Sequence, residues 1–452
     1  MRELVELLSQ ASVLVNNCVS GIDRRELGLK EVEEQIVAYV NRVGSVLVDA
    51  VMEEVAEPVS ENRVWVDGRK AIYKGESTLR FTNRFGHTVR RRRRAYQIEG
   101  TAGRWHPLDE KLGLQACSGY SPLMTYLITL FGSGEAFEAA AGKLATALGT
   151  KISATAVQRN TESIGRRVEQ RPLKSIEAAK QTTACELMIV EIDGTTSPQI
   201  TEVDGVTGRE SLKQPTEHKE CNVVVIEKCA TETGSDGSRD YRVQDRWIGA
   251  RYGPRSLLDP YVHEAGIAMG QLQAEQVVFI ADGAKHNWEI QMDNFPEAIA
   301  ILDVYHAFEH LGEYCALFDD EAQGKQRYGR WRDLMLAGNV LQLLHEMKRD
   351  RKDLTDRSEG QKHINYFITN QERMAYDTYH AMGLPMGSGL VEGSCKLVVG
   401  KRFKGNGMRW KREDNKAVLN ARLAVLNDRL DRSFLPRTRK VTFVPPKTLN
   451  AS

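Results

Sequence analysis

Two aspartates follow two apolar segments of the chain in the same way. Residues 187–194 form an apolar run that ends in Asp193 and a glycine, and residues 276–283 repeat the pattern with Asp282. Such runs predict buried strands, and open α/β sheets usually place their sites at the carboxyl ends of strands. A single Asp-Gly after a strand is more often a turn. Two such ends in one sheet favour a paired-carboxylate site.

A third carboxylate would complete a metal cluster at this position. Two or three carboxylates crowded together repel one another unless a divalent cation neutralises them. Such a cluster activates water and stabilises the leaving oxygen in phosphodiester cleavage. The candidate is Glu392, which follows Met-Gly-Ser-Gly-Leu-Val at residues 386–391. Ser388 is placed to cap a helix there, so Glu392 would lie in its first turn, near the positive end of the helix dipole.

Other acids compete with this assignment. Because side chains alternate along a strand, Glu191 should share a face with Asp193. Glu392 taken alone would also fit an ordinary surface glutamate. Spacing alone leaves four further acids as alternatives: Glu191, Asp204, Asp293 and Glu309.

Positive charge is concentrated in two segments. Residues 85–104 hold six arginines and one acid, and residues 396–412 hold seven bases and no acid. Lys and Arg supply most nonspecific affinity for nucleic-acid phosphates, and an aromatic ring can stack on an exposed base. A solvated basic helix is the alternative, but the position of the second segment directly after Glu392 favours DNA. The predicted DNA contacts are Arg90, Arg91, Arg92, Arg93, Arg94, Lys401, Arg402, Lys404, Arg409, Trp410, Lys411 and Arg412.

The elements that would position the acids follow a definite order. Apolar runs predict three strands, then a helix, a strand, a second helix and a fifth strand. This is the order of a ribonuclease-H-like α/β core. Residues 306–382 are helical in pattern and rich in charge, which indicates a long all-helical insertion into that core. The predicted strands are residues 187–194, 221–232, 241–250, 276–283 and 298–303, with a helix at residues 259–272.

The N-terminal part has a different character. Helical spacing predicts two helices at about residues 1–18 and 26–57, and short β-prone runs follow. Between residues 135 and 169 two helical patterns meet at Gly149, with Ser153 placed to cap the second. This pair fits a DNA-reading helix-turn-helix, although spacing alone favours an ordinary helical hairpin.

These patterns predict six parts of the chain. The helical and β-rich parts at the N-terminus would be DNA-binding modules, and the chemistry would belong to the α/β part. The parts are N-terminal helices at 1–60, a small β-rich basic module at 61–134, a helical pair at 135–180, the catalytic core at 181–305 plus 386–432, a helical insertion at 306–385 and an extended tail at 433–452.

Composition narrows the class of protein. The chain has 62 Lys and Arg against 61 Asp and Glu, a net charge of +1, but an acidic start offsets the two basic segments, so a polyanionic partner remains compatible. Its seven scattered cysteines include no Cys-x-x-Cys pair, which favours reduced thiols. No run reaches the roughly 18–20 apolar residues that span a bilayer, and no signal peptide is evident. We therefore expect a cytoplasmic, nucleoid-associated protein without a membrane partner.

An ordered set of motifs resembles a known family. The stretches are residues 107–114, 191–195, 281–284, 302–311 and 387–396, followed by Arg402 and Gly-Met-Arg-Trp at residues 407–410. Together they span roughly residues 80–427 and resemble bacterial insertion-sequence transposases with an Asp-Asp-Glu site, of the ISKra-type group in the Mutator-like superfamily. Each motif alone is weak, but the ordered set is specific.

The resemblance implies a function and a site. Asp193, Asp282 and Glu392 would be the catalytic acids and would bind two Mg²⁺ ions, with Mn²⁺ as the alternative. His306 would act beside a phosphate, and Asp303 would orient its imidazole, although a core histidine at a strand-to-helix turn explains the same residues. Related proteins often carry a cysteine pair after the basic strand that could hold zinc; the pair is missing here, so no zinc is expected.

The favoured hypothesis is therefore a DNA transposase that cleaves and joins strands. Its partners would be transposon-end DNA, target DNA and at least one further copy of the chain, because two DNA ends must be brought together. Two alternatives stay open: a domesticated transposase-derived DNA-binding protein without recombination activity, and a ribonuclease-H-type nuclease.

Overall fold

The computed structural model describes residues 2–169, 185–202, 206, 210, 213–233, 239–434 and 439–443. The chain divides into two compact units, one of residues 1–169 with 420–452 and one of residues 170–419. The boundaries expected at residues 60 and 134 both fall inside the first unit. Residues 420–432, which we expected in the catalytic core, also belong to the first unit, and each unit is described by itself.

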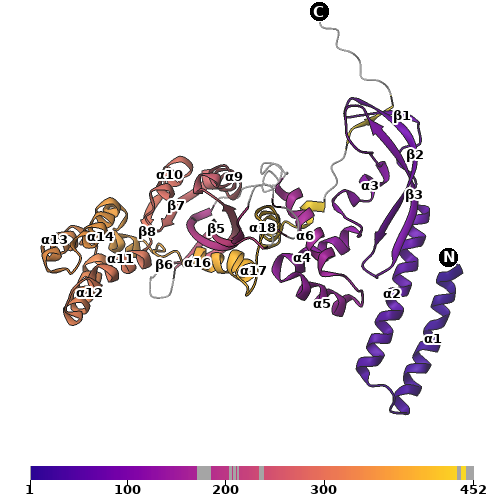
Figure 1. The fold of residues 1–452 in the computed structure, drawn as a ribbon, viewed down its shortest axis with the longest axis horizontal. Helices are drawn as coiled ribbons and strands as arrows, with labels where there is room; N and C mark the ends of the chain where they lie inside the picture. The colour runs from indigo at the N-terminus through magenta and orange to yellow at the C-terminus, as the bar shows by residue number, and fades with distance from the viewer. Residues whose placement is uncertain are drawn as a thin grey trace, which may run out of the picture. The chain divides into compact units, whose positions relative to one another are not determined.

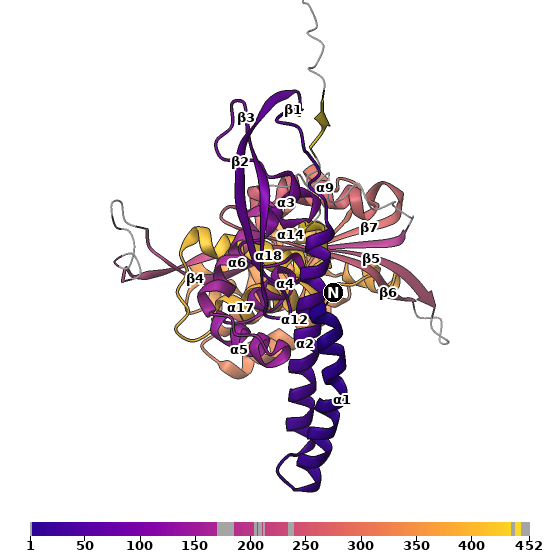
Figure 2. The same cartoon turned by 90° about the vertical axis from the view of Figure 1, so that its right-hand side faces the viewer.

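The first unit begins with a helical hairpin and a small sheet. Helices α1 (Arg2–Asp23) and α2 (Leu29–Glu54) lie side by side (Figure 1 and Figure 2). The sheet has the order β3-β2-β1-β9 and is antiparallel throughout. Part of the expected extended tail is therefore an edge strand. The strands are β1 (Arg63–Val66), β2 (Arg69–Thr82), β3 (Thr88–Ile98) and β9 (Val441–Thr442).

Three helices, rather than the predicted pair, pack together after this sheet. Helices α4, α5 and α6 share a core that contains Met124, Leu144 and Val157. Gly149 ends α5 in the left-handed region at φ 64°, which favours glycine. Before them come α3 (Pro107–Lys111) and η1 (Leu114–Ala116), and the three helices are α4 (Pro122–Gly134), α5 (Phe137–Leu148) and α6 (Ala154–Glu169).

A five-stranded mixed sheet forms the centre of the second unit. Its order is β6-β5-β4-β7-β8, with β4, β5 and β6 antiparallel and β4, β7 and β8 parallel. The predicted succession of three strands, helix, strand, helix and strand is found. The chain is thus mixed α/β. The strands are β4 (Cys185–Ile200), β5 (Thr216–Thr233), β6 (Arg239–Tyr252), β7 (Ala274–Ala281) and β8 (Ile299–Leu302).

Helices surround this sheet and extend from it. Those between the last strands are η2 (Arg255–Leu257), α9 (Asp259–Met269), η3 (Gln271–Gln273) and α10 (Lys285–Asn294). The predicted helical insertion comprises α11 (Val304–Ala316), α12 (Glu321–Leu336), α13 (Val340–Asp350), η4 (Arg351–Asp353), α14 (Arg357–Asn370), η5 (Gln371–Arg373) and α15 (Tyr376–Ala381).

The insertion is not a separately packed body. One continuous hydrophobic core joins strand residues such as Val190 and Phe279 to insertion residues such as Trp331 and Phe367. Burying these side chains in one core makes the sheet and the insertion a single cooperative unit.

The last segments return towards the sheet. Helix α16 (Gly389–Cys395) continues through a π-helical turn (Lys396–Gly400) into α17 (Lys401–Phe403). Helix α18 (Arg412–Leu426) follows and crosses the boundary between the units, and η7 (Asp431–Phe434) comes after it. None of the helices in the described ranges is long and apolar enough to cross a membrane.

Candidate active site

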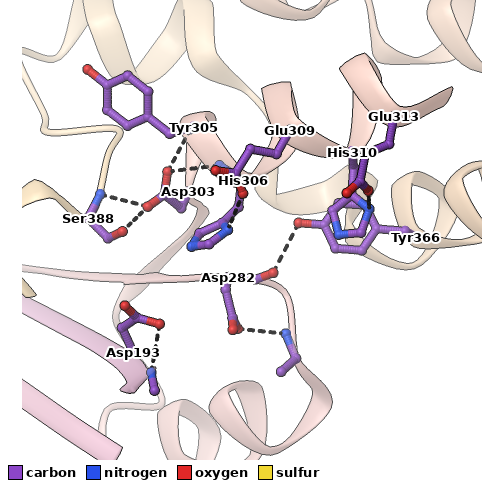
Figure 3. Close-up of polar contacts among 12 residues, drawn as sticks. Asp193, Asp282, Asp303, Tyr305, His306, Glu309, His310, Glu313, Tyr366 and Ser388 are labelled. Carbon is purple, nitrogen blue, oxygen red and sulfur yellow. Dashed lines mark hydrogen bonds and ion pairs between the residues drawn. The ribbon is translucent and has the colours of Figure 1, made fainter. Parts of the chain in front are cut away.

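Asp193 and Asp282 lie side by side where β4 and β7 stop pairing, because each is the next residue after the last pair of that parallel ladder. The two strands differ beyond this point. β7 ends directly before Asp282, whereas β4 continues past Asp193 to Ile200 in its pairing with β5, so the predicted strand end at Gly194 is wrong. Figure 3 shows both carboxylates on the same side of the sheet end. Burial raises the pKa of Asp193, its own Gly194 amide lowers it, and the charge of Asp282 raises it further. The structure therefore brings these two predicted acids together.

Asp282 is held by groups that sequence analysis missed. Its Oδ1 accepts hydrogen bonds from the Ala284 amide at 3.0 Å and from Asn287 Nδ2 at 2.7 Å. Its Oδ2 lies 3.4 Å from Nη2 of Arg255, a largely buried side chain that Asn222 Oδ1 holds at 2.8 Å. Arg255 thus places a fixed positive charge beside the two aspartates. Its only sequence signal was a lone arginine after a strand, which carries no information on its own.

Glu392 lies on the helix that packs on β4 next to Asp193. Helix α16 packs on β4, and Cys395 Sγ on that helix lies 3.9 Å from Asp193 Oδ2. The Glu392 side chain is exposed and accepts a hydrogen bond from Lys396 Nζ at 2.6 Å. Lys396 first, and His306 to a smaller extent, lower the pKa of Glu392. The third predicted acid is therefore near the pair but is turned to a lysine.

Glu191 is structural and explains how α16 is held. Its side chain is 1% exposed, and Oε2 accepts a hydrogen bond from the Val391 amide at 2.8 Å. Burial raises the pKa of Glu191 to about 8, against the lowering effect of that amide. Glu191 and Asp193 both contact α16, as expected for alternate residues of one strand. A free amide at the first turn of α16 is thereby satisfied.

Asp303 does not orient the imidazole of His306 as the resemblance implied. Its Oδ1 caps α11 by accepting from the amides of Tyr305 at 2.6 Å and His306 at 3.4 Å. Its Oδ2 accepts from the Ser388 amide at 2.9 Å and from the Ser388 hydroxyl. Ser388 is the N-cap residue of α16 and Glu392 lies in its first turn, as predicted, but the Ser388 hydroxyl donates to Asp303 and does not cap the helix. Asp303 instead ties the start of α11 to the start of α16 (Figure 3).

His306 lies beside the acids with one ring nitrogen engaged. Its Nδ1 is 3.1 Å from Glu309 Oε2, and the ring is about one-third exposed. The charge of His306 lowers the pKa of Asp193, Asp303 and Glu392 alike, which places it among all three. Glu309, one of the competing acids, is therefore the partner of His306. Asp293 is exposed on α10, and Asp204 lies outside the described residues.

The basic loop after α16 is only partly exposed. Arg402 is 1% exposed and lies over the ring of Trp410, which is itself buried and packs on Phe403. Both were predicted to contact DNA, and burial removes them from the surface that could. Segment 396–403 is helical, so its residues alternate between inside and outside with helical period. The remaining bases stay at or near the surface: Lys401, Lys404, Arg409, Lys411 and Arg412.

The five arginines of β3 are divided in the same way. Arg91 donates to the carbonyls of Met52 and Val55, and Arg93 pairs with Asp109. Arg94 stacks over Tyr73 at 3.9 Å. Arg90 and Arg92 are exposed. Strand alternation thus gives structural roles to Arg91 and Arg93, which were predicted to contact DNA.

Comparisons with known proteins give a match to one family model and matches to several solved structures. Residues 23–242 match the model of an uncharacterised protein family, UPF0236, which covers just under half of the chain. No curated protein matches the chain. One of the matching solved structures is a transposase. It is the Drosophila P element transposase strand transfer complex, which is 10% identical over 72% of this chain and 96% of that chain, with a TM-score of 0.35.

Proposed function

We propose that the chain is a DNA transposase with a ribonuclease-H-like core and an Asp-Asp-Glu site, of the insertion-sequence type that its motifs resemble. The observation that carries the proposal is the placement of Asp193 and Asp282 side by side, each directly after the last pair of the parallel β4–β7 ladder and next to the helix of Glu392. Metal-dependent phosphodiester chemistry uses acids in this arrangement. The transposase structure above is too distant to support the proposal.

The residues present fit a divalent cation. Burial first, and the nearby charge of Asp282 as well, raise the pKa of Asp193, and a cation would relieve this cost of its charged form. Among the described residues, the donor that reaches Asp193 Oδ2 is the weak Cys395 thiol. Asp193, Asp282 and Glu392 would hold Mg²⁺, or Mn²⁺ in its place, once Glu392 exchanges Lys396 for the metal. The ions would supply activation of water or a 3′-hydroxyl and stabilisation of the leaving oxygen.

The neighbouring residues have roles that follow from their contacts. Glu309 accepts from Nδ1 of His306, which leaves the other ring nitrogen to exchange a proton or a hydrogen bond with a phosphate oxygen. Arg255 provides a fixed charge beside Asp282 for the pentacovalent phosphate. Lys404 donates to Thr195 Oγ1 at 2.7 Å, two residues beyond Asp193, so it offers a cation to the DNA backbone next to the acids.

Assembly is the remaining part of the proposal. The α1–α2 hairpin exposes large apolar side chains on both helices, among them Leu8, Val15, Val40 and Val51. Isolated apolar residues at a surface are ordinary, but a row of them along two helices indicates a contact surface. We assign this surface to a second copy of the chain, because a transposase must hold two DNA ends together.

Product analysis tests the function against its two alternatives. The purified full chain is incubated with Mg²⁺, labelled DNA carrying the sequences that flank its gene, and a target plasmid. A transposase yields labelled ends covalently joined to the plasmid. Cleavage without any joined product would identify a nuclease instead, and binding without cleavage would identify a domesticated DNA-binding protein.

A further inference from the structure

A second cluster of metal-binding side chains lies in the helical insertion. His310 and Glu313 are one turn apart on α11, and His363 faces them from α14. One ligand atom from each residue lies within 4.8 Å of the other two. Figure 3 shows His310 and Glu313 away from Asp193 and Asp303. None of the three side chains has a part in the chemistry proposed above.

The distances within the cluster suit a cation with tetrahedral coordination. The two imidazole Nδ1 atoms are 3.1 Å apart, and Glu313 Oε2 lies 3.7 Å from Nδ1 of His310 and 3.9 Å from Nδ1 of His363. Zinc binds histidine nitrogen and carboxylate oxygen at about 2.0–2.2 Å, so tetrahedral ligand atoms are about 3.3 Å apart. The nitrogens are already at this spacing. The exposed Glu313 side chain needs to move inwards by only about half an ångström to match it.

The surroundings hold the two imidazoles in place. His363 is buried and meets Tyr314 edge-on at 6.5 Å between ring centroids, and His310 stacks on Tyr366 at 3.7 Å. Ligands whose orientation is fixed by packing lose little freedom when a metal binds, which raises affinity. Glu313 is 65% exposed, so the fourth position of the site opens to water.

The cluster is connected to the strand end of Asp282. Tyr366, which stacks on His310, donates its hydroxyl hydrogen to the Asp282 backbone carbonyl at 3.0 Å. A cation that fixes α11 to α14 would therefore also fix the position of Tyr366 and of the loop that begins at Asp282. The site would act on the acids through this ring.

We propose that His310, Glu313 and His363 form a zinc site that clamps α11 to α14 and positions the Asp282 loop. The expectation of no zinc came from missing cysteines near the basic strand, and histidines 53 residues apart give no local signal of a site. A hydrogen bond between the two imidazoles without any metal is the competing explanation. The inference does not depend on the proposed transposase function.

Zinc binding to the full chain tests this proposal. The chain is stripped with a chelator and titrated with Zn²⁺ in competition with a chromophoric chelator, and Co²⁺ is used as a spectroscopic substitute. We expect one tight equivalent and the visible bands of tetrahedral Co²⁺. Glu313→Gln should weaken binding about 10-fold and His363→Gln about 100-fold, by loss of a ligand.

Two controls separate the outcomes. His286→Ala removes an exposed histidine that pairs with Glu289 at the same three-residue spacing, and it should bind zinc like the wild type. The double variant Asp193→Asn and Asp282→Asn should also keep the tight equivalent, which separates this site from the candidate active site. Glu313 is exposed, so its variant will fold even if the His363 variant does not. The proposal would be overturned if Glu313→Gln and His310→Ala, each tested as a single variant, bound Zn²⁺ as tightly as the wild type. It would also be overturned if the wild type bound Zn²⁺ no more tightly than an exposed surface histidine does.

Discussion

Asp193→Asn and Asp282→Asn should each reduce Mg²⁺-dependent DNA cleavage by about 10³-fold or more, because each removes a carboxylate ligand from the site. The amide has nearly the same shape as the carboxylate, so the loss reports chemistry rather than packing. The measurement is the initial rate of cleavage of end-bearing DNA. Asp293→Asn, an exposed acid on α10, is the matched control and should retain the wild-type rate.

The same substitution at Asp193 should not lower the free energy of unfolding near neutral pH and should instead raise it. The folded chain holds the Asp193 proton more tightly than the unfolded chain does, because its pKa is raised above 3.8. The free energy of unfolding of the wild type therefore falls as pH rises from about 4 through the folded pKa, and the Asp193→Asn substitution removes that part of the fall. Urea unfolding in a chelator should show a flatter pH profile for the variant. A variant that loses cleavage together with several kcal/mol of stability would contradict the assignment.

Asp303→Ala should destabilise the second unit by about 3 kcal/mol, the sum of a lost helix cap and a buried Ser388 amide left without an acceptor. It should also lower the rate of cleavage, since Asp303 fixes the starts of both α11, which carries His306, and α16, which carries Glu392. Urea unfolding of the full chain measures the first effect.

The matched control for this prediction is Asp320→Ala. Asp320 caps α12 through the amides of Ala322 and Gln323 in the same way, but it is exposed, and within the described part of the chain it makes no second contact of the kind that Asp303 makes with Ser388. Its loss should cost only about 1 kcal/mol and leave cleavage unchanged. Equal costs for the two variants would show that the link from Asp303 to Ser388 contributes nothing.

Local patterns were sufficient for the strands but not for all of their ends. The apolar runs before Asp193 and Asp282 predicted two buried strands, and the register of their parallel pairing places the two acids side by side. The Asp-Gly pattern wrongly predicted that the first strand ends there, because β4 continues to Ile200 in its pairing with β5. Helical spacing likewise predicted α1, α2, α5 and α6 to within a few residues. Such features depend on periodicity, which a single sequence carries directly.

The wrong predictions for individual residues have two physical causes. Some depend on tertiary contacts, and others on a strand or helix periodicity that the sequence analysis did not apply. Arg402 is part of a charged run, but the helical path from α16 to α17 turns it inwards onto Trp410. Arg91 and Arg93 alternate with Arg90 and Arg92 along β3, and strand period alone would have divided them. Asp303 directly precedes the predicted start of a helix, and an aspartate in that position is a recognisable N-cap.

Two other contacts between distant segments could not be predicted from the sequence. Arg255 reaches Asp282 across 27 residues, and His363 reaches His310 across 53. Arg255 and His363 belong to no periodic pattern and no local motif. Only the sheet order and the packing of the insertion bring these pairs together.

The central claim is that Asp193, Asp282 and Glu392 together form one metal-binding site. Iron-directed cleavage of the chain tests this claim most directly. Fe²⁺ replaces Mg²⁺ in the full chain, peroxide and ascorbate generate hydroxyl radicals at the bound ion, and the fragments are mapped. The account predicts cuts near residues 193, 282 and 392 that excess Mg²⁺ suppresses and Asp193→Asn abolishes; cuts near residues 310 and 363 would report the other cluster. Cuts at the three acids that persist in Asp193→Asn, or no cuts near them, would contradict the account.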